Sequence, residues 1–361
     1  MADALPASCD WWDLRTALPL SPWQFNGEKG RSNLTFCCPG MRGTPNLTCH
    51  GRDAIIGRRI HTVGKRIAAR TRARTPERET MENREANHSE LRVLQMAELD
   101  LMKLFVRICK KHKLRYYMIG GTMLGAVRHK GFIPWDDDMD VGMPRPDYEK
   151  FLQIVRSELP EGYDFQNYKQ NPDYTRYFSK IVNTKVLVTN ASFVKEAVLY
   201  AWLDVFPLDG MPKNWLLRMA HFWYLAAWRF FYHASCYDTQ VNVHRPSRPP
   251  LQRMLIKFID VTRIGTKLDS KKLLRHMEKD LMKCDYDRSA YVVSMFGAYL
   301  QKELMPKAYF GRGGSYAFED DCFEGPELYD EFLKCLYGDY MTPPPEGSRH
   351  EHNIVKVERI A

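Results

Sequence analysis

Four aspartates crowd into five consecutive positions, and this cluster limits how the chain can fold. They are Asp136, Asp137, Asp138 and Asp140. Carboxylates this close repel one another, and burial among apolar residues makes each charge more costly unless a cation neutralises it. If the segment is a strand, Asp138 and Asp140 share one face because alternate residues point the same way. Two carboxylates on one face favour a hard divalent cation such as Mg²⁺ or Mn²⁺, whereas an acidic turn is the alternative interpretation.

Two further features favour the strand. Gly120-Gly121 follows an apolar segment, Arg115 to Ile119, and precedes a short helix. Glycines there allow the backbone to approach a phosphate, which the N–H groups at a helix start can bind. Asp204 lies inside a later apolar strand, Tyr200 to Phe206, where a buried acid needs a partner. This order of elements resembles the nucleotidyltransferase fold, in which a third carboxylate comes from a later strand.

The rest of the pattern interleaves helices and strands. Apolar spacings of three, four and seven predict a helix from Ser89 to Lys113, with Asn87 and Glu90 as a capping pair. Further helices are predicted at Thr122–Arg128, Asp147–Leu159, Trp215–Tyr232, Leu251–Ile264 and Ser270–Cys284, and further strands at Met139–Met143, Tyr163–Tyr168, Tyr177–Val182 and Val186–Thr189. The predicted fold class is α+β, a nucleotidyltransferase-like mixed β-sheet core flanked by helices, with additional C-terminal helices. Asp209, just past Pro207, is predicted to lie in a turn.

Residues 1–80 differ in composition from the rest. They hold 13 basic and 7 acidic side chains, including an Arg-rich run from Arg58 to Arg78, and show no sustained apolar period. Two interpretations stay open: a disordered extension, or a segment upstream of a true start at Met81. Residues 81–361 are then the catalytic domain and carry only +3 of the formal charge of +9. A nucleic-acid partner is not expected, because the Arg-rich run has no aromatic side chains among it.

The sequence also bears on compartment. Nine cysteines without a C-x-x-C pair predict free thiols in a reducing compartment. A signal-peptide pattern and a stretch of 18 uncharged apolar residues are both absent, so we expect a cytoplasmic protein. The aromatic segment Trp215–Tyr232 is either a core helix or an interfacial patch, with Arg218 and Arg229 at the level of lipid head groups. The second interpretation predicts peripheral contact with the inner face of the membrane.

Three segments resemble motifs of the LicD family. They are Gly120–Tyr148, Leu203–Asp209 (Leu-Asp-Val-Phe-Pro-Leu-Asp) and Leu336–Glu346 (Leu-Tyr-Gly-Asp-Tyr-Met-Thr-Pro-Pro-Pro-Glu), within a likeness that covers about Ser89 to His352. Fukutin and fukutin-related proteins are similar to the same family and use CDP-ribitol. The resemblance implies transfer of a phospho-alcohol from a CDP-linked donor such as CDP-choline to a glycan or lipid-linked glycan, as in lipopolysaccharide or teichoic acid modification. The ending Ser348–His352 departs from the family pattern, which leaves a role for His350 or His352 in doubt.

The resemblance also implies roles for single residues. The metal ligands are Asp138, Asp140 and Asp204, which would hold one or two Mg²⁺ or Mn²⁺ ions at the donor diphosphate. One of these acids, or Asp136, would take the proton of the acceptor hydroxyl. The phosphate would be positioned by Gly120, Gly121 and Thr122. The candidate donor contacts are Arg128, His129 and Lys180, each of which is alternatively an ordinary surface or strand side chain.

Two other functions remain open from the sequence. A related enzyme would transfer a nucleoside monophosphate and release pyrophosphate rather than CMP. A catalytically inactive glycan-binding module of the same fold is the non-enzyme alternative, although all three predicted metal acids are present.

Overall fold

A computed structural model describes residues 76–171, 173–190, 197–236, 254, 257, 262–345 and 354–360 of the 361-residue chain. Residues Glu85–Ala361 belong to one compact unit. Leu20–Arg84 form a second unit, of which the described part is the beginning of one helix. The predicted extension 1–80 lies outside the described residues except for 76–80, and so does most of the helix predicted at Leu251–Ile264.

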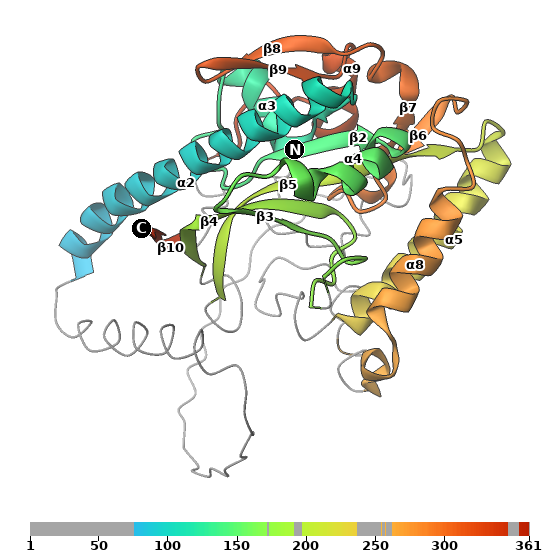
Figure 1. Ribbon diagram of the computed structural model, residues 1–361, viewed down its shortest axis with the longest axis horizontal. Helices are drawn as coiled ribbons and strands as arrows, with labels where there is room; N and C mark the ends of the chain where they lie inside the picture. Colours follow the sequence, from blue (N-terminus) through green and yellow to red (C-terminus); the bar gives the residue numbers. More distant parts are fainter. Residues whose placement is uncertain are drawn as a thin grey trace, which may run out of the picture. The chain divides into compact units, whose positions relative to one another are not determined.

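The centre of the first unit is a mixed sheet of eight strands among the described residues (Figure 1). Its main strand order is β1 (Tyr117–Met118), β2 (Asp140–Pro144), β5 (Ala197–Met211), β4 (Ser179–Asn190) and β10 (Ile354–Arg359). The remaining strands are β3 (Tyr163–Gln166), which pairs with β4, and β6 (Tyr291–Val293), which pairs with β5 and β7 (Leu304–Pro306). Strands β2 and β5 run parallel and the other pairs are antiparallel.

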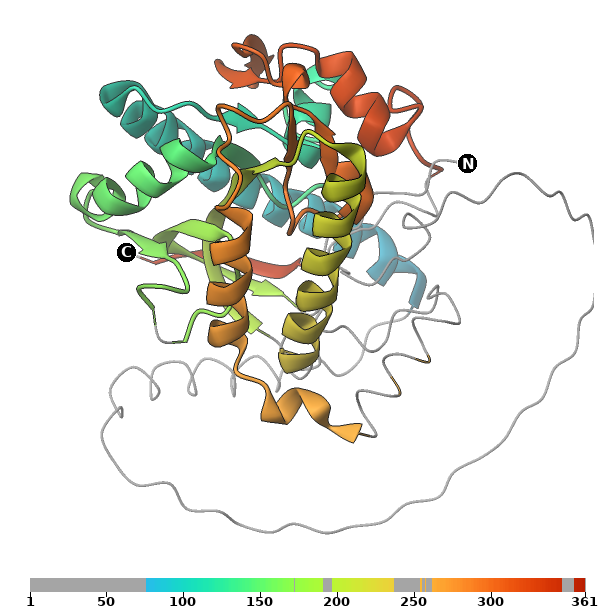
Figure 2. The ribbon, with the colours of Figure 1, turned by 90° about the vertical axis from the view of Figure 1, so that its right-hand side faces the viewer.

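Helices surround this sheet, which confirms the predicted mixed fold with flanking helices. They are α2 (Pro76–His112), α3 (Gly120–Arg128), α4 (Arg145–Glu158), α5 (Trp215–Ser235), α8 (Ser270–Leu281) and α9 (Tyr329–Tyr337). A hairpin of β8 (Gly314–Phe318) and β9 (Asp321–Gly325) lies against α2, held by ion pairs from Arg92 to Glu319 and from Lys103 to Asp320. Figure 2 shows α5 and α8 packed side by side as a pair.

Several predicted boundaries are wrong, for physical reasons. Helix α2 begins at Pro76, so Asn87 lies inside it and does not cap it; proline suits the first helical turn because it lacks an N–H. The two strands predicted at 177–182 and 186–189 are one strand, β4, whose register shifts at a bulge between Asn183 and Leu187. Asp209 is not in a turn, because β5 continues to Met211 and buries it.

Asp209 belongs to a buried ionic network that joins α4, β5 and α8. The guanidinium of Arg145 donates to both carboxylate oxygens of Asp209 at 2.6 and 2.7 Å, and to the Tyr177 hydroxyl at 2.5 Å. It also lies 3.4 Å from Glu278 of α8, which accepts from Tyr168. Loss of one partner of a buried ion pair is strongly destabilising, so the network fixes α4, α8 and the segment before β4 around the C-terminal half of β5.

The aromatic helix α5 divides its residues between core and surface. Phe222, Leu225 and Tyr232 are buried, whereas Trp215, Leu216 and Leu217 at its N-terminus are more than 60% exposed. The alternative interpretation, in which Arg218 and Arg229 lie at the level of lipid head groups, is wrong for these two residues, because both are buried and bind backbone carbonyls. Arg218 donates to Pro212 O and Lys213 O, and Arg229 donates to Met295 O and Gly297 O. Across the described part of the chain, every helix is too short or too polar to cross a membrane.

Candidate active site

Three predicted site residues lie in one row across the sheet. Asp140 on β2 is the register partner of Asp204 on the parallel strand β5, and Asp204 is the register partner of Lys180 on β4. Register partners project from the same face of a sheet, so the two carboxylates and the ammonium group are neighbours. Lys180 Nζ lies 3.0 Å from Asp204 Oδ1 and 4.4 Å from the centre of the Trp202 ring. The cation is therefore fixed beside the acids by a carboxylate and by an aromatic face.

The loop before β2 brings the other acids to this row. Oxygens of Asp136, Asp137 and Asp138 lie within 4.8 Å of one another. Within the described residues this trio is the set of acids that converges most closely, whereas the predicted ligands Asp138, Asp140 and Asp204 do not form such a group. Asp136 and Asp137 are buried, and Asp138 and Asp140 are half-buried at the edge of the cluster.

The two glycines at the start of α3 make room for these carboxylates. A Cβ added at Gly121 would lie 2.5 Å from Asp136 Oδ2, well inside van der Waals contact. Gly120 has a φ of +55°, which a side chain rarely adopts, and a Cβ there would lie 3.3 Å from Asp140 Oδ2. The first turn of α3 therefore points its N-terminus, the positive end of the helix dipole, at the acids. No side chain caps this helix start at Ile119.

Burial and mutual repulsion shift the pKa values of Asp138, Asp140 and Asp204. Burial, followed by the charge of Asp140, raises the pKa of Asp138 well above its ordinary range, and burial followed by Asp204 does the same to the pKa of Asp140. Burial raises the pKa of Asp204 less, because Lys180 opposes the shift. Burial also lowers the pKa of Lys180 although Asp204 opposes it. Without another cation, the cluster would hold protons at pH values where exposed aspartates are ionised.

The other side chains predicted to contact the donor, Thr122, Arg128 and His129, interact with other parts of the protein. The Thr122 hydroxyl accepts the backbone N–H of Asp140 at 2.7 Å and so ties α3 to β2. Arg128 Nη1 donates to Tyr340 O at 2.9 Å, which holds the third motif against the end of α3. The ring of His129 packs edge-on against Trp135 with centroids 6.2 Å apart, and burial lowers its pKa. Lys180 and Thr122 thus lie among the acids, and Arg128 links this region to the C-terminal segment.

Sequence reasoning missed three residues at this site. Glu98 on α2 is completely buried, and burial followed by the charges of Asp137 and Asp136 raises its pKa well above the ordinary value. Burial also raises the pKa of Glu303 to about 7, and its charge acts on Asp140. Tyr337 places its hydroxyl 3.9 Å from a Cβ built on Gly120. Glu98 interrupts the apolar stripe of Leu94, Leu101 and Phe105. Tyr337 lies within the third motif, Leu336–Glu346, so the sequence held a signal for these two residues and not for Glu303.

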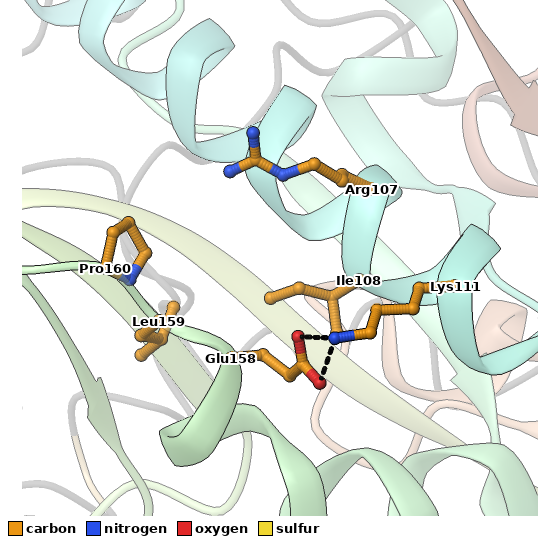
Figure 3. Close-up of a pocket in the computed structure, with 6 residues that line it drawn as sticks. All are labelled: Arg107, Ile108, Lys111, Glu158, Leu159 and Pro160. Atoms are coloured by element: carbon orange, nitrogen blue, oxygen red, sulfur yellow. Dashed lines mark hydrogen bonds and ion pairs between the residues drawn. The ribbon is translucent and has the colours of Figure 1, made fainter.

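A divalent cation fits this donor set on three grounds. The ligand atoms are carboxylate oxygens alone, which suits Mg²⁺ or Mn²⁺. Both carboxylate oxygens of Glu98 are buried and have no hydrogen-bond partner among the described residues. The glycine at position 121 keeps the Asp136 carboxylate against the helix start, where any side chain would displace it. The pocket of about 320 Å³ in Figure 3 is a different feature, lined by Arg107, Ile108, Lys111, Glu158, Leu159 and Pro160.

Comparison with known proteins adds an independent line of support. A family model described as LicD/FKTN/FKRP, nucleotidyltransferase domain, matches residues 113–206, the stretch that holds Gly120, Asp140 and Asp204. The lipopolysaccharide cholinephosphotransferase LicD of Haemophilus influenzae is 31% identical over 269 residues, which cover 73% of this chain and 96% of that protein. The chain belongs to the LicD family. It is a LicD-like phosphotransferase, as its three motifs predict.

Shorter matches to this LicD-family chain come from two Rickettsia proteins. A protein of Rickettsia typhi is 41% identical over 69 residues, 19% of this chain and 22% of that protein. A protein of Rickettsia prowazekii is 41% identical over 63 residues, 18% of this chain and 24% of that protein. These matches cover too little of either chain to bear on activity.

Proposed function

We propose that this LicD-family protein transfers phosphocholine from CDP-choline to a hydroxyl of a cell-surface glycan or glycolipid precursor, with release of CMP. The observation that carries the proposal is the row of Asp140, Asp204 and Lys180 in register across the sheet, beside the glycine start of α3. A diphosphate needs positive charge and N–H donors close to fixed acids, and this row offers each of them. The relative in Haemophilus influenzae supports choline as the alcohol.

In the proposed reaction, the acceptor oxygen attacks the phosphorus that carries choline. A P–O bond forms to the acceptor, the bond to CMP breaks, and CMP leaves with the electron pair of that bond. Asp138, Asp140 and Asp204 would hold Mg²⁺ or Mn²⁺, which when bound withdraws charge from the phosphate groups. One of these acids, or Asp136, receives the acceptor proton.

The other residues orient the reactants. Lys180, fixed between Asp204 and Trp202, supplies a positive charge that does not depend on a bound cation. Gly120 and Gly121 allow a phosphate to approach the first N–H groups of α3. Thr122 holds Asp140 through its backbone N–H, and Arg128 keeps the segment around Tyr340 against α3. His129 packs edge-on against Trp135, and its proposed donor contact rests on the resemblance to the family.

We propose that the acceptor is presented at a lipid surface. Trp215, Leu216 and Leu217 form a continuous exposed apolar cluster at the N-terminus of α5, with Lys213 exposed next to it. A tryptophan beside a lysine suits the boundary between acyl chains and anionic head groups. Flotation with anionic phospholipid vesicles tests this contact. The triple substitution Trp215→Ser, Leu216→Ser, Leu217→Ser should abolish vesicle binding. Equal flotation of this variant and wild type would contradict the proposed lipid contact.

A donor panel tests the transfer itself. Purified protein with Mg²⁺ and a lipopolysaccharide acceptor is given CDP-choline, CDP-ribitol or CDP-glycerol, and both CMP and pyrophosphate are measured. The proposal expects CMP, fastest from CDP-choline. Faster release from CDP-ribitol or CDP-glycerol would assign a different alcohol to the same reaction. Pyrophosphate from a nucleoside triphosphate would favour nucleotidyl transfer, and no release with any donor would favour the inactive glycan-binding module.

A further inference from the structure

The carboxyl group of Glu98 is the most unusual polar group among the described residues. Its side chain has an exposed fraction of 0%. Neither of its two oxygens has a hydrogen-bond partner in the part of the chain that the structure describes. Burial of a polar group without a partner costs several kcal/mol, and an ionised carboxylate costs more. A bound ligand or a proton would therefore stabilise this carboxyl group.

The packing of α2 places Glu98 over the acidic site. One turn earlier, Gln95 Nε2 donates to Asp136 O at 2.9 Å and to Ile133 O at 3.3 Å, so this face of the helix lies directly on the aspartate loop. Residues three apart on a helix are neighbours on one face, which puts Glu98 beside Gln95.

The helix also contacts the sheet next to the row of acids. Leu94 and Ala97 pack in one buried cluster with Val182 and Trp202. Val182 lies two residues from Lys180 on β4, and Trp202 lies two residues from Asp204 on β5. Because alternate residues of a strand point the same way, Val182 and Trp202 share a face of the sheet with Lys180 and Asp204. Glu98, next to Ala97 and one turn after Gln95, therefore lies where α2 meets both the aspartate loop and this face. Figure 1 shows α2 running past β4 and β5.

The charges around Glu98 are mostly negative. Those that act on its carboxyl are Asp137, Asp136 and Asp204, with Lys180 as the opposing cation. Lys180 is already 3.0 Å from Asp204. A fourth acid at this position raises the repulsion within the cluster, and it gains a partner only if a cation binds.

We propose that Glu98 is a further carboxylate ligand of the divalent cation proposed for this cluster of aspartates. This assignment rests on the proposed use of a cation by the enzyme. It places one ligand on α2, outside the three motifs, so cation binding would join that helix to the loop before β2. Asp136, Asp137 and Asp138 bring their oxygens within 4.8 Å of one another, and Glu98, which is outside this group, would supply a further oxygen from α2.

Direct cation binding tests the proposal without reference to catalysis. Mn²⁺ is titrated into the full-length, chelator-treated protein, and free Mn²⁺ is followed by electron paramagnetic resonance. Glu98→Gln keeps the shape and removes the charge, and we expect its Kd for Mn²⁺ to rise about 10-fold or more. Asp100→Asn is the matched control, because Asp100 lies on the exposed face of the same helix and its loss changes the net charge equally. Its Kd should stay within about twofold of wild type.

The outcomes separate the two proposals. Equal Mn²⁺ affinity of Glu98→Gln and wild type overturns the role of Glu98 while the transfer reaction stands. Absence of Mn²⁺ binding to wild type overturns both the role of Glu98 and the cation. If Glu98→Gln fails to fold, infrared difference spectra of Glu303→Gln labelled with ¹³C-carboxyl glutamate decide, because Glu303 also has a raised pKa and would otherwise contribute a band of the same kind. Loss of a protonated glutamate band on addition of Mg²⁺ supports the assignment, and an unchanged spectrum overturns it.

Discussion

Gly121→Ala isolates the contact between α3 and Asp136. The added Cβ would lie 2.5 Å from Asp136 Oδ2, whereas ordinary contact begins at 3.4 Å, so the carboxylate must move by about 1 Å. The φ of Gly121 is not positive, and alanine favours a helix over glycine by about 1 kcal/mol, which offsets part of an overpacking cost of about 1–3 kcal/mol. We therefore expect the free energy of unfolding to change by no more than about 2 kcal/mol.

Activity should respond far more than stability. A displacement of about 1 Å in a reacting group can lower a rate by about 100-fold, and we expect that loss in CMP release from CDP-choline with Mg²⁺. Gly131→Ala is the control, because its Cβ would also meet a carboxylate oxygen at 2.5 Å, that of Glu319, which is paired with Arg92 away from the acids. Equal rates for Gly121→Ala and wild type, or an equal loss in Gly131→Ala, would refute the reasoning.

Three further predictions address stability. Lys180→Met leaves Asp204 without its cation and should lower the free energy of unfolding by about 3 kcal/mol in cation-free buffer, measured with urea. Arg145→Met leaves Asp209 buried without a partner; it should cost about 3–5 kcal/mol while the Mn²⁺ affinity of the folded protein is unchanged. Glu303 has a pKa raised from 4.5 to about 7, so the folded state holds its proton more tightly and the stability this provides is lost as pH rises through that interval. Glu303→Gln should therefore show a smaller fall in unfolding free energy between those pH values than wild type.

The sequence predicted the local order of elements around the candidate site. Gly120, Gly121 and the strand after Asp138 lie close together in the chain, so apolar pattern and glycine placement were enough to order them. Asp204 was also found, because an acid inside an apolar strand stands out in a sequence. Its alignment with Asp140 depends on the parallel pairing of β2 and β5, which the apolar pattern does not specify and the structure shows.

The missed and wrong assignments depended on contacts between distant segments. Glu303 and Tyr337 reach the site only through packing of the C-terminal elements, whose short strands β6 to β9 carry little periodic signal. Arg218 and Arg229 looked like surface cations of an aromatic helix, and their backbone carbonyl partners come from other segments or from the helix start. Asp209 follows a proline, which suggested a turn, and its burial was decided by Arg145 more than sixty residues earlier.

The rate of CMP release by Asp140→Asn tests the central claim most directly. The variant and wild type are compared with CDP-choline, a lipopolysaccharide acceptor and Mg²⁺, and Asp164→Asn is the control because Asp164 lies on β3 and pairs with Arg156. Loss of a charged ligand at the diphosphate should slow the reaction by about 10³-fold in Asp140→Asn and leave the control near wild type. CMP release by Asp140→Asn as fast as wild type would contradict the account.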